Sequence, residues 1–161
     1  LFRSHDHLSV IGFAYYAREI RPGTLAELTW HGDEFGTNLQ HGLLLARRIL
    51  ERHPGSNKEI VVITDGEPTA RLLANGLASF SWPPDAETLA VTVAEVDKMT
   101  RRHATLNVFM LGEDPRLREF VDDVAQRNGG RVFTPDADRL GEFVLSDFLA
   151  RRDRLARRGP R

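Results

Sequence analysis

Two short polar segments carry the residues of this sequence that are best suited to chemistry. Thr64-Asp65-Gly66-Glu67 combines a hydroxyl, two carboxylates and a glycine that is free to take positive φ, directly after an apolar run. Gly36-Thr37-Asn38-Leu39 places a second hydroxyl in front of an amphipathic segment. Hydroxyl and carboxylate oxygens are ligands of hard cations such as Mg²⁺. Asp65 is therefore the first candidate, although Asp-Gly after a strand is also an ordinary turn.

The elements around these segments predict a strand–helix–strand unit. Four consecutive β-branched apolar residues, Ile60 to Ile63, are typical of a central parallel strand that is buried on both faces. Thr37 or Asn38 is a natural N-cap for the helix that follows, and an earlier strand is expected over Leu8 to Tyr16. In such a unit both polar segments lie near the sheet edge where α/β proteins bind ligands.

The rest of the chain continues the alternation of strands and helices. The further predicted elements are a short edge strand at Leu25 to Leu28, a helix capped by Asp85, a strand at Leu106 to Leu111, a helix from Asp114-Pro115 to Gly129-Gly130, a short strand at 131–134 and a terminal helix. Phe80 and Trp82 are expected to pack against their own domain. The pattern predicts a doubly wound, Rossmann-like α/β fold with a mostly parallel sheet and one short antiparallel edge strand.

Composition limits the class of protein. The 161 residues with a net charge of −1 predict one domain over 1–150, followed by a basic and flexible tail over 151–161 that contains six arginines and one aspartate. No apolar run is long enough to cross a membrane. The absence of cysteine excludes disulfides and thiol catalysis and fits a cytoplasmic location.

Taken in order, the motifs resemble those of the von Willebrand factor A (vWA) domain family over about residues 6–150. The matching pieces are the strand Val10-Ile11-Gly12-Phe13, the Gly-Thr-Asn-Leu helix start, the strand that ends in Thr-Asp-Gly-Glu-Pro, and Asn-Gly-Gly-Arg-Val-Phe before the last helix. The sequence segments 36–41, 63–70 and 143–149 resemble those of intracellular bacterial members of the family that are encoded beside AAA+ ATPases of the MoxR type.

This resemblance implies a metal-ion-dependent adhesion site for one divalent ion, Mg²⁺ or Mn²⁺. Thr37 would supply a hydroxyl ligand, Asp65 would bind directly or through water, and Glu67 would be an exposed rim residue. The implied partner is a protein, a MoxR-type AAA+ ATPase, rather than nucleic acid or a membrane. Catalysis is not expected, because the chain has no glycine-rich phosphate loop.

One family motif is absent. No Asp-x-Ser-x-Ser segment occurs in the sequence, and in the family this motif lies on a central first strand that is followed by a helix. We therefore expect the first strand and first helix to be lacking and the metal to bind weakly or not at all. The two strands that would flank the missing one could pair directly, pair with another copy in a homodimer, or be completed by residues outside the sequence.

Two other functions remain open. A metal-assisted hydrolase or phosphotransfer domain could use Asp65 with Glu67 and Asp33, and it would need another carboxylate, for which Glu113 and Asp114 are candidates. A degenerate scaffold would bind no metal.

Overall fold

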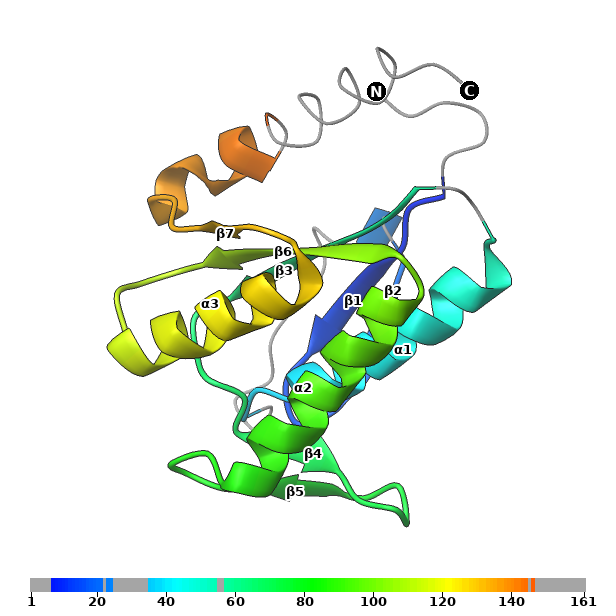
Figure 1. The fold of residues 1–161 in the computed structure, drawn as a ribbon, viewed down its shortest axis with the longest axis vertical. Coiled ribbons are helices and arrows are strands. Elements are labelled where there is room, and N and C mark those ends of the chain that lie inside the picture. The colour runs from blue at the N-terminus through cyan, green and yellow to red at the C-terminus, as the bar shows by residue number, and fades with distance from the viewer. Residues whose placement is uncertain (1–6, 22, 25–34, 55–56, 145, 147–161) are drawn as a thin grey trace.

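A computed structural model describes residues 7–21, 23–24, 35–54, 57–144 and 146, and shows an α/β fold (Figure 1). Its main sheet has three parallel strands in the order β3 (Lys58–Thr64), β6 (Ala104–Met110) and β7 (Val132–Phe133). The long helices are α1 (Leu39–Arg52), α2 (Ala86–Arg101) and α3 (Pro115–Asn128). Helix α2 packs between α1 and α3. The predicted α/β class with a parallel sheet is confirmed.

The hydrophobic core lies between this sheet and the three helices. Its strand residues share one face of the sheet: Val62 of β3 and Leu106, Val108 and Met110 of β6. The helices contribute Leu39, Leu43, Val96, Met99, Leu117, Val121 and Val124. The spacing of three and four residues within each helix brings its apolar residues onto the side that faces the sheet.

The first part of the described chain forms an antiparallel hairpin. Strand β1 (Val10–Phe13) pairs with β2 (Ala17–Ile20), and Ala14 donates a backbone hydrogen bond to the Tyr16 carbonyl at 3.0 Å in the turn between them. The prediction of one continuous strand from Leu8 to Tyr16 was wrong, because this turn reverses the chain. The predicted edge strand at Leu25 to Leu28 lies outside the described residues.

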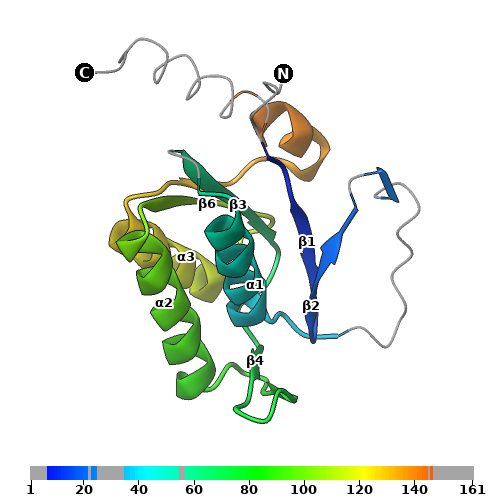
Figure 2. The same ribbon diagram turned by 90° about the vertical axis from the view of Figure 1, so that its right-hand side faces the viewer.

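Strand β1 does not join the main sheet. Within the described ranges its hydrogen-bonded neighbour is β2, and β3 pairs with β6. The described strands β1 and β3 therefore do not pair with each other. Direct pairing was one of the three outcomes considered from the sequence. Helix α1 packs against the β1–β2 hairpin and against the main sheet (Figure 2). Leu43 of α1 and Val62 of β3 belong to one hydrophobic core, and Phe13 of β1 packs against that core.

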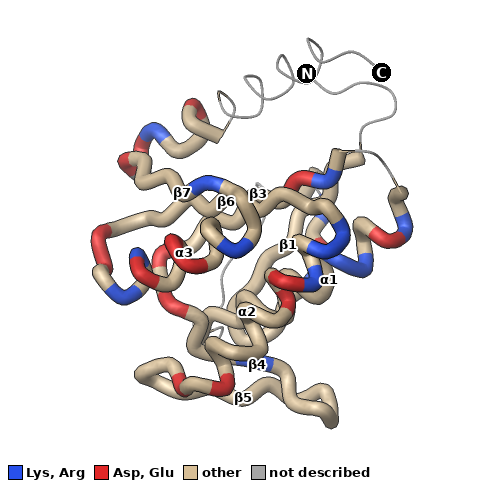
Figure 3. The backbone as a smooth tube through the Cα atoms, viewed as in Figure 1, with Lys and Arg blue, Asp and Glu red and all other residues tan. Residues whose placement is uncertain are grey.

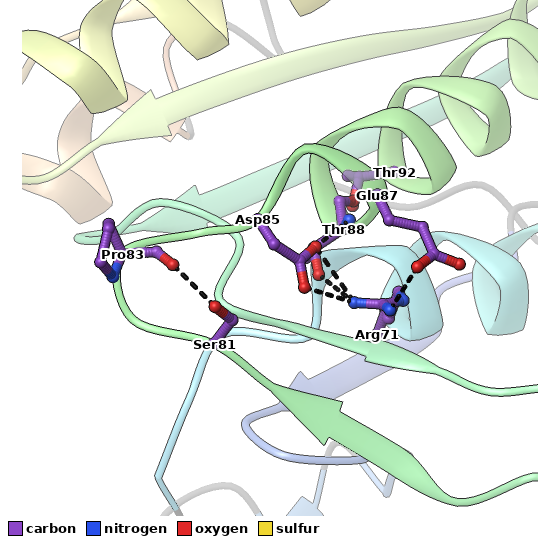
Figure 4. Close-up of polar contacts among 7 residues, drawn as sticks. All are labelled: Arg71, Ser81, Pro83, Asp85, Glu87, Thr88 and Thr92. Atoms are coloured by element: carbon purple, nitrogen blue, oxygen red, sulfur yellow. Dashed lines mark hydrogen bonds and ion pairs between the residues drawn. The ribbon is translucent and has the colours of Figure 1, made fainter.

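A second hairpin was not predicted. Strands β4 (Ala70–Leu72) and β5 (Ala78–Phe80) have three residues each, too few to show a period in the sequence. Arg71 ties this hairpin to the start of α2, donating to both carboxylate oxygens of Asp85 at 3.1 and 2.8 Å, to the Thr88 hydroxyl at 2.8 Å and to Glu87 at 2.6 Å (Figure 4).

The predicted helix ends are confirmed. Asn38, Asp85 and Asp114 are the N-caps of α1, α2 and α3, and Gly129 ends α3 in the left-handed region at φ 73°. The predicted terminal helix is helical at 140–144, whereas the basic tail at 151–161 lies outside the described residues. None of the described helices combines the length and apolar character needed to cross a membrane.

Candidate functional site

The start of α1 is fixed by a buried side chain. Asn38 is fully buried; its Oδ1 accepts from the His41 amide at 2.9 Å and its Nδ2 donates to the Tyr15 carbonyl at 2.9 Å. Its own amide donates to the Ala14 carbonyl at 2.8 Å. One residue therefore caps the helix and anchors it to the β1–β2 turn, which sets the position of Thr37 immediately before it.

Thr37 is also fastened to the segment that follows β3. Its amide donates to the Thr69 hydroxyl at 2.9 Å, and its carbonyl accepts from the amides of Thr69 and Ala70 at 3.1 and 3.3 Å. The preceding Gly36 takes φ 85°, and a Cβ there would stand 3.2 Å from the Phe80 ring. A glycine is needed at that position because a side chain would be strained and crowded.

The two predicted polar segments meet at Gly66. The Thr37 hydroxyl oxygen lies 3.5 Å from the point where a Cβ on Gly66 would stand. The Thr64 hydroxyl closes the turn by donating to the Gly66 carbonyl at 3.0 Å and accepting from its amide at 3.4 Å. Asp65 is exposed within this turn. Gly66 does not take positive φ, and a Cβ there would make only an ordinary contact with the Thr37 hydroxyl, so neither backbone strain nor crowding requires glycine at this position.

Glu67 differs from the sequence-based expectation. It was considered either a rim residue of the metal site or an ordinary exposed glutamate after a turn, but only 8% of it is exposed, and its buried Oε2 has no hydrogen-bond partner among the described residues. The nearest cation is Nε of Arg116 in α3 at 3.7 Å, and this arginine lies over the Trp82 ring. No pattern in the sequence indicates this burial. An orphaned buried oxygen of this kind is a common sign of a bound water or ion.

The side chains near Gly66 include oxygen donors of the kinds that hard cations bind. The candidate donors are the Thr37 hydroxyl and the carboxylates of Asp65 and Glu67. Across the described ranges, no group of three or more His, Cys, Asp or Glu side chains could hold a metal ion. Mg²⁺ prefers about six oxygen ligands and gives up its water reluctantly, so a site with few protein ligands binds weakly.

The other carboxylates considered for catalysis are placed differently. Asp114 is engaged in capping α3, with Oδ1 accepting from the amides of Arg116 and Leu117 at 2.8 and 3.2 Å. Glu113 lines a cleft of about 500 Å³ at the ends of β6 and β7. Asp33 lies outside the described residues. Phe80 and Trp82 contact their own domain as expected, through the Phe35 ring and through Arg116, but 43% and 61% of them remain exposed.

A surface that we name the hairpin patch borders Thr37. It consists of the exposed apolar residues Tyr16, Phe35, Leu73, Leu77 and Phe80. The rings of Phe35 and Phe80 meet edge to face at 5.2 Å, and the Tyr16 hydroxyl accepts from the Ala78 amide at 3.0 Å. The β4–β5 hairpin is almost free of charge, in contrast to the helices (Figure 3). Apolar and aromatic surface of this kind is typical of protein interfaces.

Comparison with known proteins identifies the family. Residues 2–149 match the family described as "Rv0959-like protein, vWA domain". Relatives of this chain include the "Uncharacterized protein Rv0959" of Mycobacterium tuberculosis and the "Uncharacterized protein Mb0984" of Mycobacterium bovis. Each is 46% identical over 159 residues, which cover 95% of this chain but only 23% of the relative. The chain thus spans about a quarter of the length of these relatives, and it belongs to the vWA family as an Rv0959-like vWA domain.

Proposed function

We propose that this vWA domain is a protein-protein interaction module that binds its partner at the Thr37–Asp65 edge through a divalent cation. The observation that supports the proposal is the position of the Thr37 hydroxyl, 3.5 Å from where a Cβ on Gly66 would stand, which brings two separate polar segments near one another. In this proposal Thr37 and Asp65 form a partial metal-ion-dependent adhesion site for Mg²⁺ or Mn²⁺.

The chemistry of the edge suits recognition better than catalysis. A bound cation would keep exchangeable water positions, and an acidic side chain of a partner can occupy one of them. The hairpin patch lies beside Thr37, because Phe80 contacts Gly36 and its ring meets Phe35. A partner with an acidic residue next to apolar residues could therefore bind the cation with the acidic residue and the hairpin patch with the apolar residues.

The partner that we propose is an AAA+ ATPase of the MoxR type, acting with this domain in the assembly or maturation of other proteins. The proposal rests on the resemblance of segments 36–41, 63–70 and 143–149 to vWA proteins encoded beside such ATPases. We place this activity in the cytoplasm, which the absence of cysteine supports.

The test is a binding measurement between the purified protein and a MoxR-type ATPase from the same organism. We expect saturable binding in Mg²⁺ that EDTA abolishes and that Thr37→Val or Asp65→Asn weakens at least tenfold. Asp123→Asn is the matched control, because this exposed carboxylate of α3 forms an ion pair with Arg127 at 2.8 Å. Binding that survives EDTA and both substitutions would overturn the metal-dependent mechanism. Absence of binding to the ATPase would overturn the proposed partnership.

A further inference from the structure

Arg116 and Trp82 form an exposed pair of a cation and an aromatic ring. The guanidinium carbon of Arg116 lies 5.7 Å from the centroid of the Trp82 ring, within the range of a cation–π contact. Both side chains are more than half exposed. Arginine and tryptophan are enriched among the residues that carry most of the binding energy at protein interfaces. The pair is therefore well suited to bind a partner.

The guanidinium of Arg116 retains its hydrogen-bonding capacity. Its Nε lies 3.7 Å from Glu67 Oε2, which makes an ion pair but is too long for a hydrogen bond. No other described residue accepts a hydrogen bond from this guanidinium. Arg71 provides the contrast, because it is nearly buried and donates to the cap and first turn of α2 at 2.6 to 3.1 Å (Figure 4). Of these two arginines, Arg116 is the one that a ligand can reach.

The surroundings of this guanidinium hold it in one orientation. The buried carboxylate of Glu67 attracts the Nε side of the group, and the Trp82 ring lies beneath its carbon. The turn that carries the tryptophan is itself closed, since the Ser81 hydroxyl donates to the Pro83 carbonyl at 2.9 Å (Figure 4). The Ser81 amide donates to the Thr69 carbonyl at 2.9 Å. The terminal nitrogens Nη1 and Nη2 therefore remain as a fork whose geometry matches a carboxylate.

The charge of the surroundings selects the ligand. A cation would have to reach Glu67, which is buried, whereas the accessible charge is the guanidinium of Arg116. A polyanion such as nucleic acid would meet the segment 113–119, which has three carboxylates and two arginines and so a net charge of −1. A single carboxylate avoids this repulsion, because one bidentate contact with a guanidinium satisfies it.

Apolar surface beside the pair indicates what should flank that carboxylate. Trp82 follows Phe80 of the hairpin patch by two residues, and both rings are exposed. Apolar residues of a partner that cover these rings would exclude water from the ion pair. Exclusion of water from the centre of an interface is what allows a few contacts to dominate its affinity.

We propose that Arg116 and Trp82 form an anchor for one acidic side chain of a partner protein. The Nη1 and Nη2 groups of Arg116 donate to the carboxylate, and the Trp82 ring packs against apolar residues next to it. The inference rests on the proposed role of this domain as an interaction module, but it does not require the bound cation.

The test is a selection of short random peptides displayed on phage, carried out in EDTA so that metal-dependent binding contributes nothing. We expect the selected sequences to share one Asp or Glu with apolar neighbours. Synthetic versions with acetylated and amidated ends are then titrated by fluorescence polarisation, so that no terminal charge contributes. Arg116→Gln and Trp82→Ala should each weaken binding at least tenfold. Arg127→Gln removes the same charge near the other end of α3 and should leave binding unchanged.

Two further comparisons separate the ion pair from general packing. A peptide with Gln in place of its acidic residue should bind the wild type and Arg116→Gln equally weakly, because each charge acts through the other. Arg116→Lys keeps the charge without the fork and should recover only part of the affinity. Thermal denaturation of each variant checks that the domain remains folded.

Four results would overturn the proposal. They are no enrichment of any peptide, selected sequences without a shared acidic residue, binding that Arg116→Gln leaves unchanged, and equally strong Arg116-dependent binding of a single-stranded DNA oligonucleotide. The proposed metal-dependent site fails separately. Its failure would leave peptide binding in EDTA intact, and failure of the Arg116 anchor would leave the Mg²⁺-dependent effects of Thr37→Val and Asp65→Asn intact.

Discussion

Thr37 and Thr69 exchange two hydrogen bonds: the Thr37 amide donates to the Thr69 hydroxyl at 2.9 Å, and the Thr69 amide donates to the Thr37 carbonyl at 3.1 Å. This reciprocal contact fixes Thr37, which precedes the cap residue of α1, to Thr69, which precedes β4. The hydroxyl of Thr37 is thereby held beside Gly66, independently of any ligand.

Removal of the Thr69 hydroxyl should loosen this arrangement. Thr69→Val leaves the Thr37 amide without its acceptor. An unpaired donor away from water lowers the free energy of unfolding by about 1–3 kcal/mol. We expect the free energy of unfolding in urea to fall by about that amount and Mn²⁺ affinity to fall with it. Thr69→Ser keeps the acceptor and should behave like the wild type. Equal losses in the two variants would show that the hydroxyl plays no part.

Asn38 should be among the residues most sensitive to substitution. Asn38→Ala removes the cap of α1 and also leaves the Tyr15 carbonyl without its donor. Loss of a cap costs about 1 kcal/mol of stability, and loss of the donor to the Tyr15 carbonyl adds a similar amount. We therefore expect chemical denaturation to show a free energy of unfolding lower by about 2 kcal/mol. Asn38→Asp keeps the cap and should cost about half as much. A cost below about 0.5 kcal/mol for Asn38→Ala would contradict the double role.

Glu67 should favour cation binding at the expense of stability. Within the part of the chain that the structure describes, its buried carboxylate has one orphaned oxygen and forms an ion pair with the exposed Arg116. Replacement of a poorly compensated buried charge by an apolar group of similar size is often stabilising by about 1 kcal/mol or more. Glu67→Met should therefore raise the melting temperature in EDTA and weaken Mn²⁺ binding, whereas Glu67→Gln should weaken binding with a smaller gain in stability. A large loss of stability in both variants would show that the carboxylate is structural.

His41 should make the domain less stable in mild acid. Burial lowers the pKa of this histidine, and the positive charge of Arg48 lowers it further. Its Nδ1 accepts from the Ala17 amide at 3.0 Å, which requires that nitrogen to be unprotonated. Because the folded-state pKa lies below the unfolded value of 6.5, the unfolded chain binds more protons between the two values.

The stability contributed by neutral His41 is therefore fully present above about pH 6.5 and is lost as the pH falls toward the folded-state pKa. We expect the melting temperature to drop between pH 7 and pH 5, and this drop to be smaller in His41→Gln, whose amide oxygen can still accept from Ala17. Thermal denaturation across this range is the measurement. Identical pH profiles for the two proteins would exclude His41 as the cause.

Local chemistry made much of this fold predictable from the sequence. Helices start at the predicted caps Asn38, Asp85 and Asp114, and α3 ends at Gly129 as predicted. These ends were predictable because capping depends on a few neighbouring residues. The run Ile60 to Ile63 is in a strand as expected, but the expected burial on both faces was wrong for the described structure, because Val61 and Ile63 are 42% and 41% exposed. The hydroxyl of Thr37 and the turn that contains Asp65 were also predicted to lie near one another, and the Thr37 hydroxyl lies 3.5 Å from the point where a Cβ on Gly66 would stand.

Features that depend on distant contacts were missed. Glu67 pairs with Arg116 of α3 at 3.7 Å, 49 residues away, and the β4–β5 hairpin depends on bonds such as that from the Leu72 amide to Gln40 Oε1 at 3.0 Å, 32 residues away. The turn at Ala14 was hidden by the aromatic residues Tyr15 and Tyr16, which favour strands but here bond to the hairpin at Ala78. The roles of Thr37 and Asp65 as metal ligands remain predictions.

The most direct test of the proposed function is a Mn²⁺ titration of the 161-residue protein, followed by calorimetry and by the loss of the free-ion electron paramagnetic resonance signal. With few protein oxygens at the edge, we predict one saturable site with a dissociation constant of about 1 mM, equivalent to about −4 kcal/mol. Asp65→Asn and Thr37→Val should each weaken binding at least tenfold, and Asp123→Asn should leave it unchanged. Binding that is unaltered by the first two substitutions, or no binding at all by the wild type, would contradict the account.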